Sequence, residues 1–258
     1  MKTERKNVWE ETCLLRFSAI DRSDRLTLAT VFDFFQEAAI SHAENLGVGR
    51  DSMLQTGQAW ILSRMSVEFR ERPRYEETVQ VRSWPRGIEK LFALRDYDIR
   101  NSNDVPVVQA RSCWLIIDTE KRRPLRPQSV MDKLPQNEGL DALPSGAVAL
   151  SEQQGLQKTA EMKAAYSVLD YNGHVNHVSY IRWIQNALEP ALLENAASMR
   201  LDINYLNEVL PGETVEIWNA PIGSCAAGES AFAFEGRKTN GPAAFRAELR
   251  LRNGTGND

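Results

Sequence analysis

The feature that most restricts the fold of this chain is an internal repeat of its strand pattern. Residues 67–69 and 77–81 (VEF and ETVQV) recur as residues 203–205 and 213–217 (INY and ETVEI), at an offset of about 136 residues. Two strands and their connection are reproduced in register, which indicates a duplicated unit. The chain has 258 residues, 42% of them apolar, which is enough to give each copy a core.

Each copy is predicted to contain one long helix and an antiparallel sheet. In the first copy, a strand over residues 8–20 precedes a helix over residues 28–46, whose broad apolar face includes His42. Because of this position, His42 is interpreted as a core histidine with satisfied ring nitrogens. Four segments of strand character follow, at residues 59–70, 77–85, 89–100 and 105–118.

A change in composition separates the two copies. Residues 135–157 are rich in Gly, Pro, Ser, Asn, Gln and acidic residues without a sustained period, which predicts an exposed linker. The pattern then restarts with a strand at 161–169, the Asp170 turn, a helix that ends at about Leu193, and strands at 199–207, 213–221, 230–238 and 243–252. We therefore predict an N-terminal domain over residues 1–140, a linker over 141–157 and a C-terminal domain over 158–258.

Three polar residues precede the second helix. Asp170, Asn172 and His174 stand before an apolar series at helical spacing within residues 175–184, so we expect them at the helix N-terminus. The unpaired N–H groups there carry partial positive charge and suit a carbonyl oxygen that becomes an oxyanion. These residues are therefore the candidate centre of the molecule.

The same alignment of the two copies predicts one active centre per chain. Matching the two helices at an offset of about 147 residues sets Ser23, Arg25 and Thr27 opposite the three polar residues. On this alignment the first copy has the frame without the polar cluster.

A structural interpretation of the cluster competes with the catalytic one. An Asp-x-Asn sequence before a helix is more often a cap and turn than a catalytic site. The addition of His174 and the two-copy frame favours catalysis. His177, one turn further on, is interpreted as a surface or packing residue, and Asn176 as a residue that orders the turn.

Composition and charge exclude several classes of protein. The net charge of -4 gives the whole molecule no electrostatic reason to bind nucleic acid. No run of about 18 apolar residues is present, and the charged start of the chain (MKTERK) predicts no signal peptide. Cys13, Cys113 and Cys225 lie far apart without metal-ligand spacing, which predicts reduced thiols in a cytoplasm and no structural zinc.

Motifs in both halves resemble those of one known family. Residues 169–184 read LDYNGHVNHVSYIRWI, and the first half carries QEA at 36–38, WILSRM at 60–65 and WLIIDTEKRRP at 114–124. Together they resemble the acyl-acyl-carrier-protein thioesterases of plants and bacteria. The resemblance implies an α+β tandem hotdog fold, in which each half is a long helix wrapped by an antiparallel sheet. It also implies a hydrolase that releases free fatty acid from acyl carrier protein and ends fatty acid synthesis, without metal or cofactor.

The resemblance further implies a set of site residues. Asp170, Asn172 and His174 would act with a Glu on the next strand, which matches Glu208. Plant members commonly have Cys after that Glu, but Val209 excludes a cysteine nucleophile at this place. Our hypothesis is that Glu208 or Asp170, with His174, deprotonates water while Asn172 and backbone N–H groups hold the thioester carbonyl. A covalent acyl-Asp170 intermediate is an open alternative.

The first copy is predicted to set substrate selectivity. Each buried methylene of an acyl chain contributes about 0.8 kcal/mol, so the length of an apolar tunnel would select the chain length. The candidate lining residues, each of which is equally well explained as ordinary core, are Phe32, Phe35, Met53, Trp60 and Met65.

Docking of an acidic carrier protein requires a local basic patch. The densest basic run is residues 121–126 (KRRPLR), and Arg122 and Arg123 are the predicted contacts. A second run at Arg70, Arg72 and Arg74 is interpreted as a solvated strand end.

Two rival functions stay open at this point. An acyl-coenzyme A thioesterase would prefer the nucleotide thioester, and a non-catalytic acyl-binding module would bind a thioester without turnover. Two copies in one chain can satisfy the pairing that single hotdogs achieve as dimers, so both a monomer and a homodimer are compatible with the sequence.

Overall fold

The repeated strand pattern builds one continuous antiparallel sheet. The computed structural model describes residues 4–223 and 228–254, and within them the strands follow the order β1-β3-β4-β5-β2-β8-β11-β10-β9-β7, with β6 paired to β5 off this path. The two halves join where β2 (Gln58–Phe69) pairs with β8 (Ala196–Tyr205), with Val67 opposite Leu201. The order in the second half mirrors the order in the first, as the duplication predicts.

Side chains along each strand of this sheet point alternately to its two faces. In the first half the remaining strands are β1 (Trp9–Leu14), β3 (Thr78–Glu89), β4 (Phe92–Arg100), β5 (Pro106–Asp118) and β6 (Arg123–Leu125). In the second half they are β7 (Gln157–Lys163), β9 (Thr214–Pro221), β10 (Glu229–Lys238) and β11 (Ala243–Asn253).

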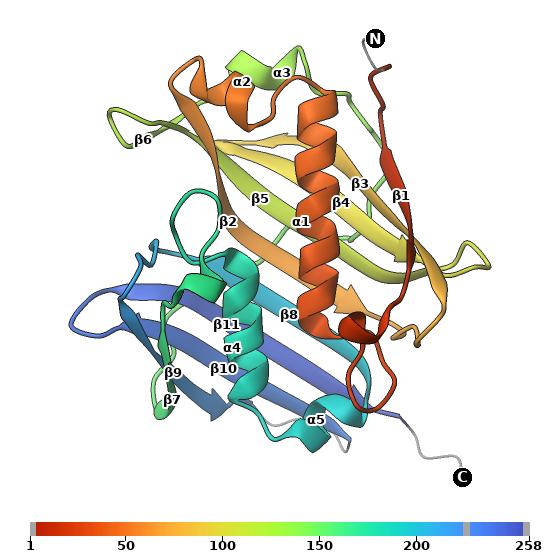
Figure 1. The fold of residues 1–258 in the computed structure, drawn as a ribbon, viewed down its shortest axis with the longest axis vertical. Helices are drawn as coiled ribbons and strands as arrows, with labels where there is room; N and C mark the ends of the chain where they lie inside the picture. The colour runs from red at the N-terminus through yellow and green to blue at the C-terminus, as the bar shows by residue number, and fades with distance from the viewer. Residues whose placement is uncertain (1–3, 224–227, 255–258) are drawn as a thin grey trace.

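One main helix of each half packs on the same face of the sheet (Figure 1). Helix α1 (Leu28–Asn45) is capped by the Thr27 side chain, and α4 (His177–Asn186) by the Asn176 side chain. The helix expected over residues 28–46 is confirmed, as are the α+β class and the tandem hotdog arrangement. Asn176 orders the helix start, as the sequence indicated.

Several element boundaries were predicted wrongly. The strand expected over 8–20 ends at Leu14 and is followed by a 3₁₀ turn (Phe17–Ala19), and the strand expected over 161–169 ends at Lys163 before a 3₁₀ turn (Tyr166–Val168). The second helix was expected to reach Leu193, but α4 ends at Asn186 and a separate helix α5 (Pro190–Glu194) follows. Proline lacks an N–H group and fits the first turn of a helix, so Pro190 starts a new helix.

The main hydrophobic core lies between the sheet and helices α1 and α4 and runs through both halves. A smaller cluster (Leu46, Val48, Met53, Ile116 and Val130) lies near the short helices α2 (Arg50–Leu54) and α3 (Gln128–Met131). None of the described helices is long and apolar enough to cross a membrane.

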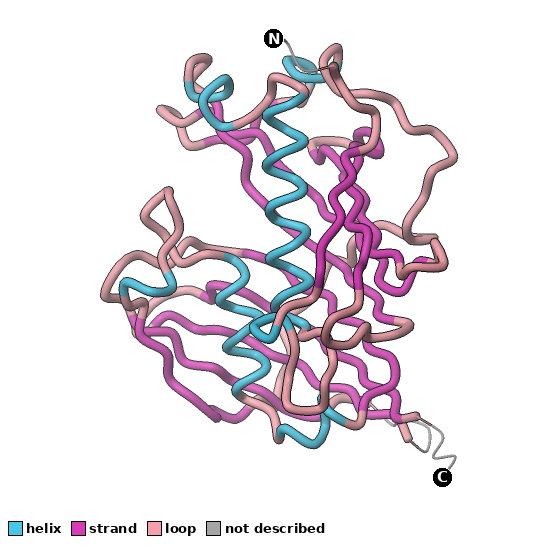
Figure 2. The backbone as a smooth tube through the Cα atoms, turned by 45° about the vertical axis from the view of Figure 1, so that its right-hand side comes forward, coloured by secondary structure: helices cyan, strands magenta, loops and turns pink. Residues whose placement is uncertain are grey.

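The segment between the halves, residues 135–157, is mostly exposed, as expected of a linker, but it is docked on the outer face of the sheet. Figure 2 draws it as a pink loop on the side of the strands away from α1. Ala142 and Leu143 are buried, and the Ala142 N–H donates to Asp96 Oδ2 at 2.8 Å. Because polar side chains of the outer face bond this backbone, the segment acts as a strap.

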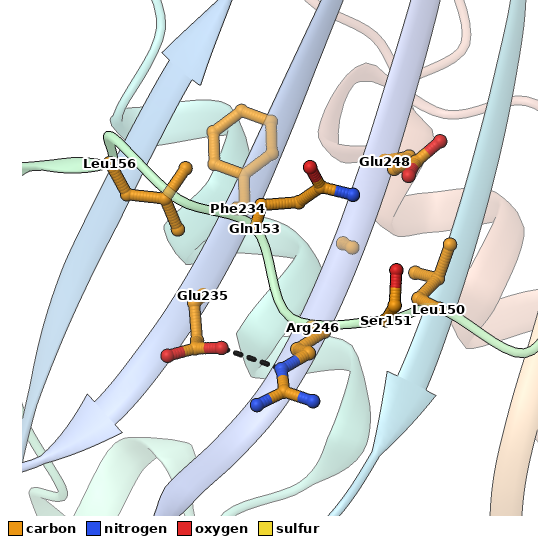
Figure 3. A pocket seen from close by; sticks show the side chains of 9 residues that line it. Leu150, Ser151, Gln153, Leu156, Phe234, Glu235, Arg246 and Glu248 are labelled. Atoms are coloured by element: carbon orange, nitrogen blue, oxygen red, sulfur yellow. Dashed lines mark hydrogen bonds and ion pairs between the residues drawn. The ribbon is translucent and has the colours of Figure 1, made fainter. Parts of the chain in front are cut away.

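The strap continues along the second half. Its Leu150 N–H donates to Asn204 Oδ1 at 2.8 Å. Further along, residues 150–156 cover the Arg246–Glu235 ion pair (Nε–Oε2 2.6 Å), where a cavity of about 10 Å³ holds at most one water (Figure 3).

Helices α1 and α4 are also bonded to each other. Arg182 Nη2 lies 2.6 Å from Asp33 Oδ2, and the Ala29 N–H donates to Gln185 Oε1 at 3.1 Å. These contacts join the C-terminal part of α4 to the start of α1.

Candidate active site

The turn before α4 is built around the carboxylate of Asp170. Asp170 Oδ1 accepts hydrogen bonds from the backbone N–H of Asn172 at 2.8 Å and of His174 at 3.3 Å, and the Asp170 N–H donates to the His174 carbonyl at 2.8 Å. Gly173 has a φ of +80°, a left-handed conformation that favours glycine. Leu169 and Val175 close the turn as an isolated bridge pair. The backbone itself therefore fixes where these side chains stand.

The expectation that Asp170, Asn172 and His174 lie at the helix N-terminus is wrong in one respect. The helix begins at His177, so the three residues lie in the turn that precedes it. The N–H groups of Asn172 and His174 already donate to Asp170 and are not free to hold a carbonyl oxygen.

His174 and Glu208 lie side by side. His174 Nε2 is 3.4 Å from Glu208 Oε2, and the two side chains are 37% and 44% exposed. Glu208 stands just beyond the end of β8, and the adjacent chain is tied to the turn because the Val175 N–H donates to the Val209 carbonyl at 2.9 Å. A carboxylate and an imidazole in contact at the surface form a pair that can bind and deprotonate a water molecule.

Two arginines of the first half reach this pair and its turn. Arg122, in the turn between β5 and β6, places Nη2 3.7 Å from Glu208 Oε1. Arg50, at the start of α2, donates from Nε to Asn172 Oδ1 at 3.4 Å and lies 4.3 Å above the ring of Tyr171. Sequence reasoning assigned Arg122 to carrier docking and missed Arg50, since no local pattern links residues so far apart in the chain. The site draws on both halves.

The first half contains a counterpart of the turn, and it differs from the one predicted. Asp21 Oδ1 accepts from the N–H of Ser23 at 2.9 Å and of Arg25 at 3.2 Å, and Ile20 pairs with Leu26. Asp21 therefore stands opposite Asp170, at an offset of 149 residues, and the predicted alignment that set Ser23 there was shifted by two residues. The first copy keeps the turn carboxylate.

The predicted lining residues fall into two groups. Phe32, Phe35 and Met65 lie in the main core, 0%, 1% and 3% exposed. Met53 and Trp60 belong to the smaller cluster near α2, where the Trp60 indole N–H donates to the Val48 carbonyl at 2.8 Å. Arg123 is exposed on β6, beside Arg122.

The other histidines and cysteines have structural surroundings. His42 is buried, with Nε2 2.9 Å from the Lys6 carbonyl and Nδ1 3.1 Å from Arg95 Nη1, which confirms a core histidine. Burial lowers the pKa of His42 to about 4, and burial lowers that of His177 to about 4 as well. Cys13 and Cys113 are free thiols, and Cys225 lies outside the described residues.

The part of the chain that the structure describes brings no three His, Cys, Asp or Glu side chains together as a metal site. The side chains gathered at the turn are two carboxylates, an imidazole, an amide and two guanidinium groups.

Comparisons with known proteins agree with this architecture. Residues 6–134 match the family described as acyl-ACP thioesterase N-terminal domain, and residues 151–255 match its C-terminal domain. An oleoyl-acyl carrier protein thioesterase of Arabidopsis thaliana is 22% identical over 81% of this chain and 61% of that protein. A palmitoyl-acyl carrier protein thioesterase of Cuphea hookeriana is 26% identical over 78% of this chain and 52% of that protein. The chain thus spans about half to three-fifths of these curated relatives.

Solved structures share the whole fold. An acyl-ACP thioesterase from Bacteroides thetaiotaomicron superposes with a TM-score of 0.81 at 23% identity, covering 94% of this chain and 97% of that one. The 12:0-ACP thioesterase from Umbellularia californica gives 0.83 at 18% identity, covering 97% and 96%. Both share the fold of this chain from end to end.

Proposed function

This chain belongs to the acyl-ACP thioesterase family, and from that premise we propose that it hydrolyses the thioester of acyl carrier protein and releases free fatty acid. The observation that carries the proposal is the contact of His174 with Glu208 beside a turn built on Asp170. Plain acyl binding would not require an imidazole and a carboxylate in contact at the surface.

The reaction needs an activated water and a stabilised oxyanion. The leaving thiol has a pKa of about 8.5 and departs without an acid. We assign Glu208 as the base that takes a proton from water while His174 orients that water. The hydroxide oxygen then bonds to the carbonyl carbon, and collapse of the oxyanion breaks the C–S bond and releases the thiolate. Arg122 Nη2 lies 3.7 Å from Glu208 Oε1 and attracts this carboxylate electrostatically.

Asn172 is assigned to the thioester carbonyl through its side-chain amide. Its Oδ1 accepts from Arg50, so its NH₂ group is oriented as a donor. Asp170 is assigned to the shape and charge of the turn, because Oδ1 already accepts two N–H groups. These bonds make it a poorer nucleophile, which favours attack by water over an acyl-Asp170 intermediate.

The division of labour follows the two copies. We propose that residues 1–140 receive the acyl chain, that residues 158–258 supply the chemistry and that residues 141–157 join them. The proposed lining consists of Phe32, Phe35 and Met65 in the main core and of Met53 and Trp60 in the smaller cluster. A cytoplasmic location is supported by widely spaced cysteines, although the plant relatives are chloroplastic. A monomer and a homodimer both remain compatible with this assignment.

A panel of acyl-carrier and acyl-coenzyme A thioesters tests the function. We expect the higher kcat/KM on the carrier substrates and a loss of at least about 10²-fold in the Asp170→Asn variant, whose side chain keeps the acceptor but not the charge. Thermal unfolding of the variant should match the native protein. Preference for the coenzyme A thioesters, or binding without turnover, would replace this proposal with one of its rivals.

Carrier docking on Arg123 has its own test. The exposed Arg123 does not touch the centre, whereas Arg122 does, so Arg123→Glu isolates docking from chemistry. We expect a KM for acyl carrier protein raised several-fold and less sensitive to salt, with the acyl-coenzyme A reaction unchanged. Arg70→Glu, an exposed arginine of the other basic run, is the matched control. Equal effects of the two variants would remove the docking role.

A further inference from the structure

Two buried side-chain polar atoms in residues 4–223 and 228–254 have no hydrogen-bond partner: Gln109 Oε1 and Tyr205 Oη. The first belongs to a side chain that holds the strap, since Gln109 Nε2 donates to the Ala142 carbonyl at 2.6 Å. The Tyr205 hydroxyl has no such explanation. A buried hydroxyl without a partner destabilises the folded protein, so its retention calls for a functional reason.

The hydroxyl lies close to the candidate centre. Tyr205 is the last residue of β8, three residues before Glu208. Its ring lies edge-on to His177, with centroids 5.7 Å apart, and 6.0 Å from the ring of Tyr180, both on α4. The charge of Asp170 acts on both of these side chains. The aromatic cluster thus lies on α4, the helix that follows the Asp170 turn.

Tyr205 also has an aromatic neighbour in the first half. Burial and the neighbouring phenols of Tyr180 and Tyr97 raise the pKa of Tyr205 well above its ordinary value, so it stays a protonated donor. Tyr97 belongs to β4 of the first half, where its ring lies 4.8 Å from that of Phe35, one of the proposed acyl-lining residues. Tyr205 ends β8, the strand that pairs with β2 of the first half, so it lies at the junction with the half that is proposed to receive the acyl chain.

The first half shows what the fold alone requires at this place. In both halves two consecutive N–H groups after the strand bond one carbonyl: those of Arg70 and Glu71 bond Val107, and those of Leu206 and Asn207 bond Ala244. This match sets Phe69 opposite Tyr205. Phe69 is 1% exposed and packs in the core without a hydroxyl. The ring thus serves the fold, and the hydroxyl is an addition in the half that carries His174 and Glu208.

We propose that Tyr205 is a catalytic residue, whose hydroxyl donates a hydrogen bond to the thioester carbonyl oxygen and holds the oxyanion that forms when water adds. The proposal rests on the proposed function. It adds a second donor beside the Asn172 side-chain amide, because the backbone N–H groups of Asn172 and His174 are bonded to Asp170. As the water oxygen bonds to the carbon, the carbonyl electron pair moves to the oxygen beside Tyr205, and its return expels the thiolate. In a buried site this bond strengthens with the developing charge.

Tyr205→Phe gives the second half the phenylalanine that the first half has at Phe69, and it tests whether the Tyr205 hydroxyl is catalytic. We expect kcat on acyl carrier protein to fall about 10²–10³-fold with KM within a few-fold, as for loss of one oxyanion donor. The melting temperature should be equal or higher, because an unpartnered buried hydroxyl is removed. Tyr180→Phe removes a neighbouring hydroxyl and should change kcat by no more than a few-fold. An unchanged kcat in Tyr205→Phe, or a fall in kcat matched by a fall in melting temperature, would overturn the proposal.

A binding measurement separates this proposal from the hydrolase assignment. Two acylated pantetheine analogues are compared by calorimetry: a ketone, in which CH₂ replaces the sulfur, and a thioether, in which CH₂ replaces the carbonyl. Tyr205→Phe should weaken the ketone at least about fivefold and leave the thioether unchanged. If the native protein binds both analogues and Tyr205→Phe discriminates between them without any turnover of thioesters, the hydrolase assignment fails and the carbonyl contact stands. Equal loss of both analogues would reject the contact.

Discussion

The turns at residues 20–26 and 169–175 have the same backbone hydrogen-bond pattern but differ in the charged side chains beside them. In each, an aspartate accepts two N–H groups, donates its own N–H to the carbonyl four residues on, and precedes a left-handed residue at the third position after it, Asp24 in one and Gly173 in the other. The turn carboxylate is thus a feature that both halves share.

The two turns differ in the residue that follows the neighbouring strand, β2 in the first half and β8 in the second. The Leu26 N–H bonds the carbonyl of Pro73 and the Val175 N–H bonds that of Val209, which sets Arg72 opposite Glu208. Arg72 is 4% exposed and forms an ion pair with Asp21. In the second half the same place carries a second carboxylate, which contacts His174. The first turn neutralises its charge internally, and the second leaves a carboxylate and an imidazole available to a ligand.

Glu208→Arg should erase this difference and has the largest expected effect. An arginine at this place would pair with Asp170 as Arg72 pairs with Asp21, and would remove the base. We expect hydrolysis to fall about 10³–10⁴-fold with the melting temperature within a few degrees. Glu208→Gln, which removes the charge without adding a cation, is the control and should lose activity to a similar extent. Retention of near-native turnover in both variants would leave the contrast between the turns without catalytic meaning.

The converse change, Arg72→Glu, should act on stability. The Arg72 guanidinium donates from Nε to the Leu26 carbonyl at 2.9 Å and from Nη1 to the Leu193 carbonyl at 2.8 Å, besides its ion pair. Loss of these bonds beside a partly buried carboxylate should cost about 3–5 kcal/mol of unfolding free energy in urea titrations. Arg74→Glu is the control, because Arg74 is 53% exposed and forms a surface ion pair of 3.5 Å with Asp24. This variant should lower the free energy of unfolding by less than about 1 kcal/mol. Similar costs would show that Arg72 is not the element that closes the first turn.

The pH dependence of stability should single out Asp21. Burial alone would raise its pKa, but hydrogen bonds from Ser23 and Arg72 lower it below the ordinary 3.8. A carboxyl whose pKa is lowered by folding stabilises the protein above its unfolded pKa, and this contribution is lost as the pH falls through the folded pKa. Asp21→Asn should therefore be less stable than the native protein by about 2 kcal/mol at pH 7, with a deficit that shrinks below about pH 4.

Urea titrations from pH 7 to pH 2.5 measure this deficit. Asp24→Asn is the matched control, since Asp24 is 47% exposed on its side chain and lies 3.5 Å from Arg74. Its deficit should be small and nearly constant. A deficit for Asp21→Asn that stays level on acidification would mean that the charge of Asp21 does not contribute to folding.

The comparison also explains which parts of the structure were readable from sequence. The alternation of apolar residues in the strands and the apolar face of α1 depend on local periods of two and 3.6 residues, so their positions were predicted closely. The alignment of the turns failed because the strands repeat at an offset of 136 residues and the turns at 149, and helix periodicity alone allowed a shift of two residues. The shared signal was an aspartate with polar residues two and four positions later, at Asp21 and Asp170.

The contacts between the two halves and the docking of the strap could not be predicted from local sequence patterns. Arg50 and Arg122 reach Asn172 and Glu208 from the first half, and such contacts depend on how the halves join at β2 and β8. The strap was interpreted as exposed because its composition is polar. Its docking on the sheet depends on hydrogen bonds from its backbone to side chains of the outer sheet face, such as Asp96, which strand periodicity cannot reveal. The unpartnered Tyr205 hydroxyl is likewise invisible without the fold.

The smallest expected effect concerns the left-handed residue of each turn. Gly173 has a φ of +80° and no atom within 4 Å of an added Cβ, so Gly173→Ala meets no clash and pays only for the backbone conformation, about 1 kcal/mol of unfolding free energy. Gly173→Asp should cost less, because aspartate tolerates this conformation and Asp24 adopts it in the first turn with a φ of +59°. Gly139→Ala, at a φ of +77° and equally open, is the control for Gly173→Ala away from the site. A larger cost for aspartate than for alanine would show that the two turns share a hydrogen-bond pattern without sharing the backbone tolerance on which their comparison depends.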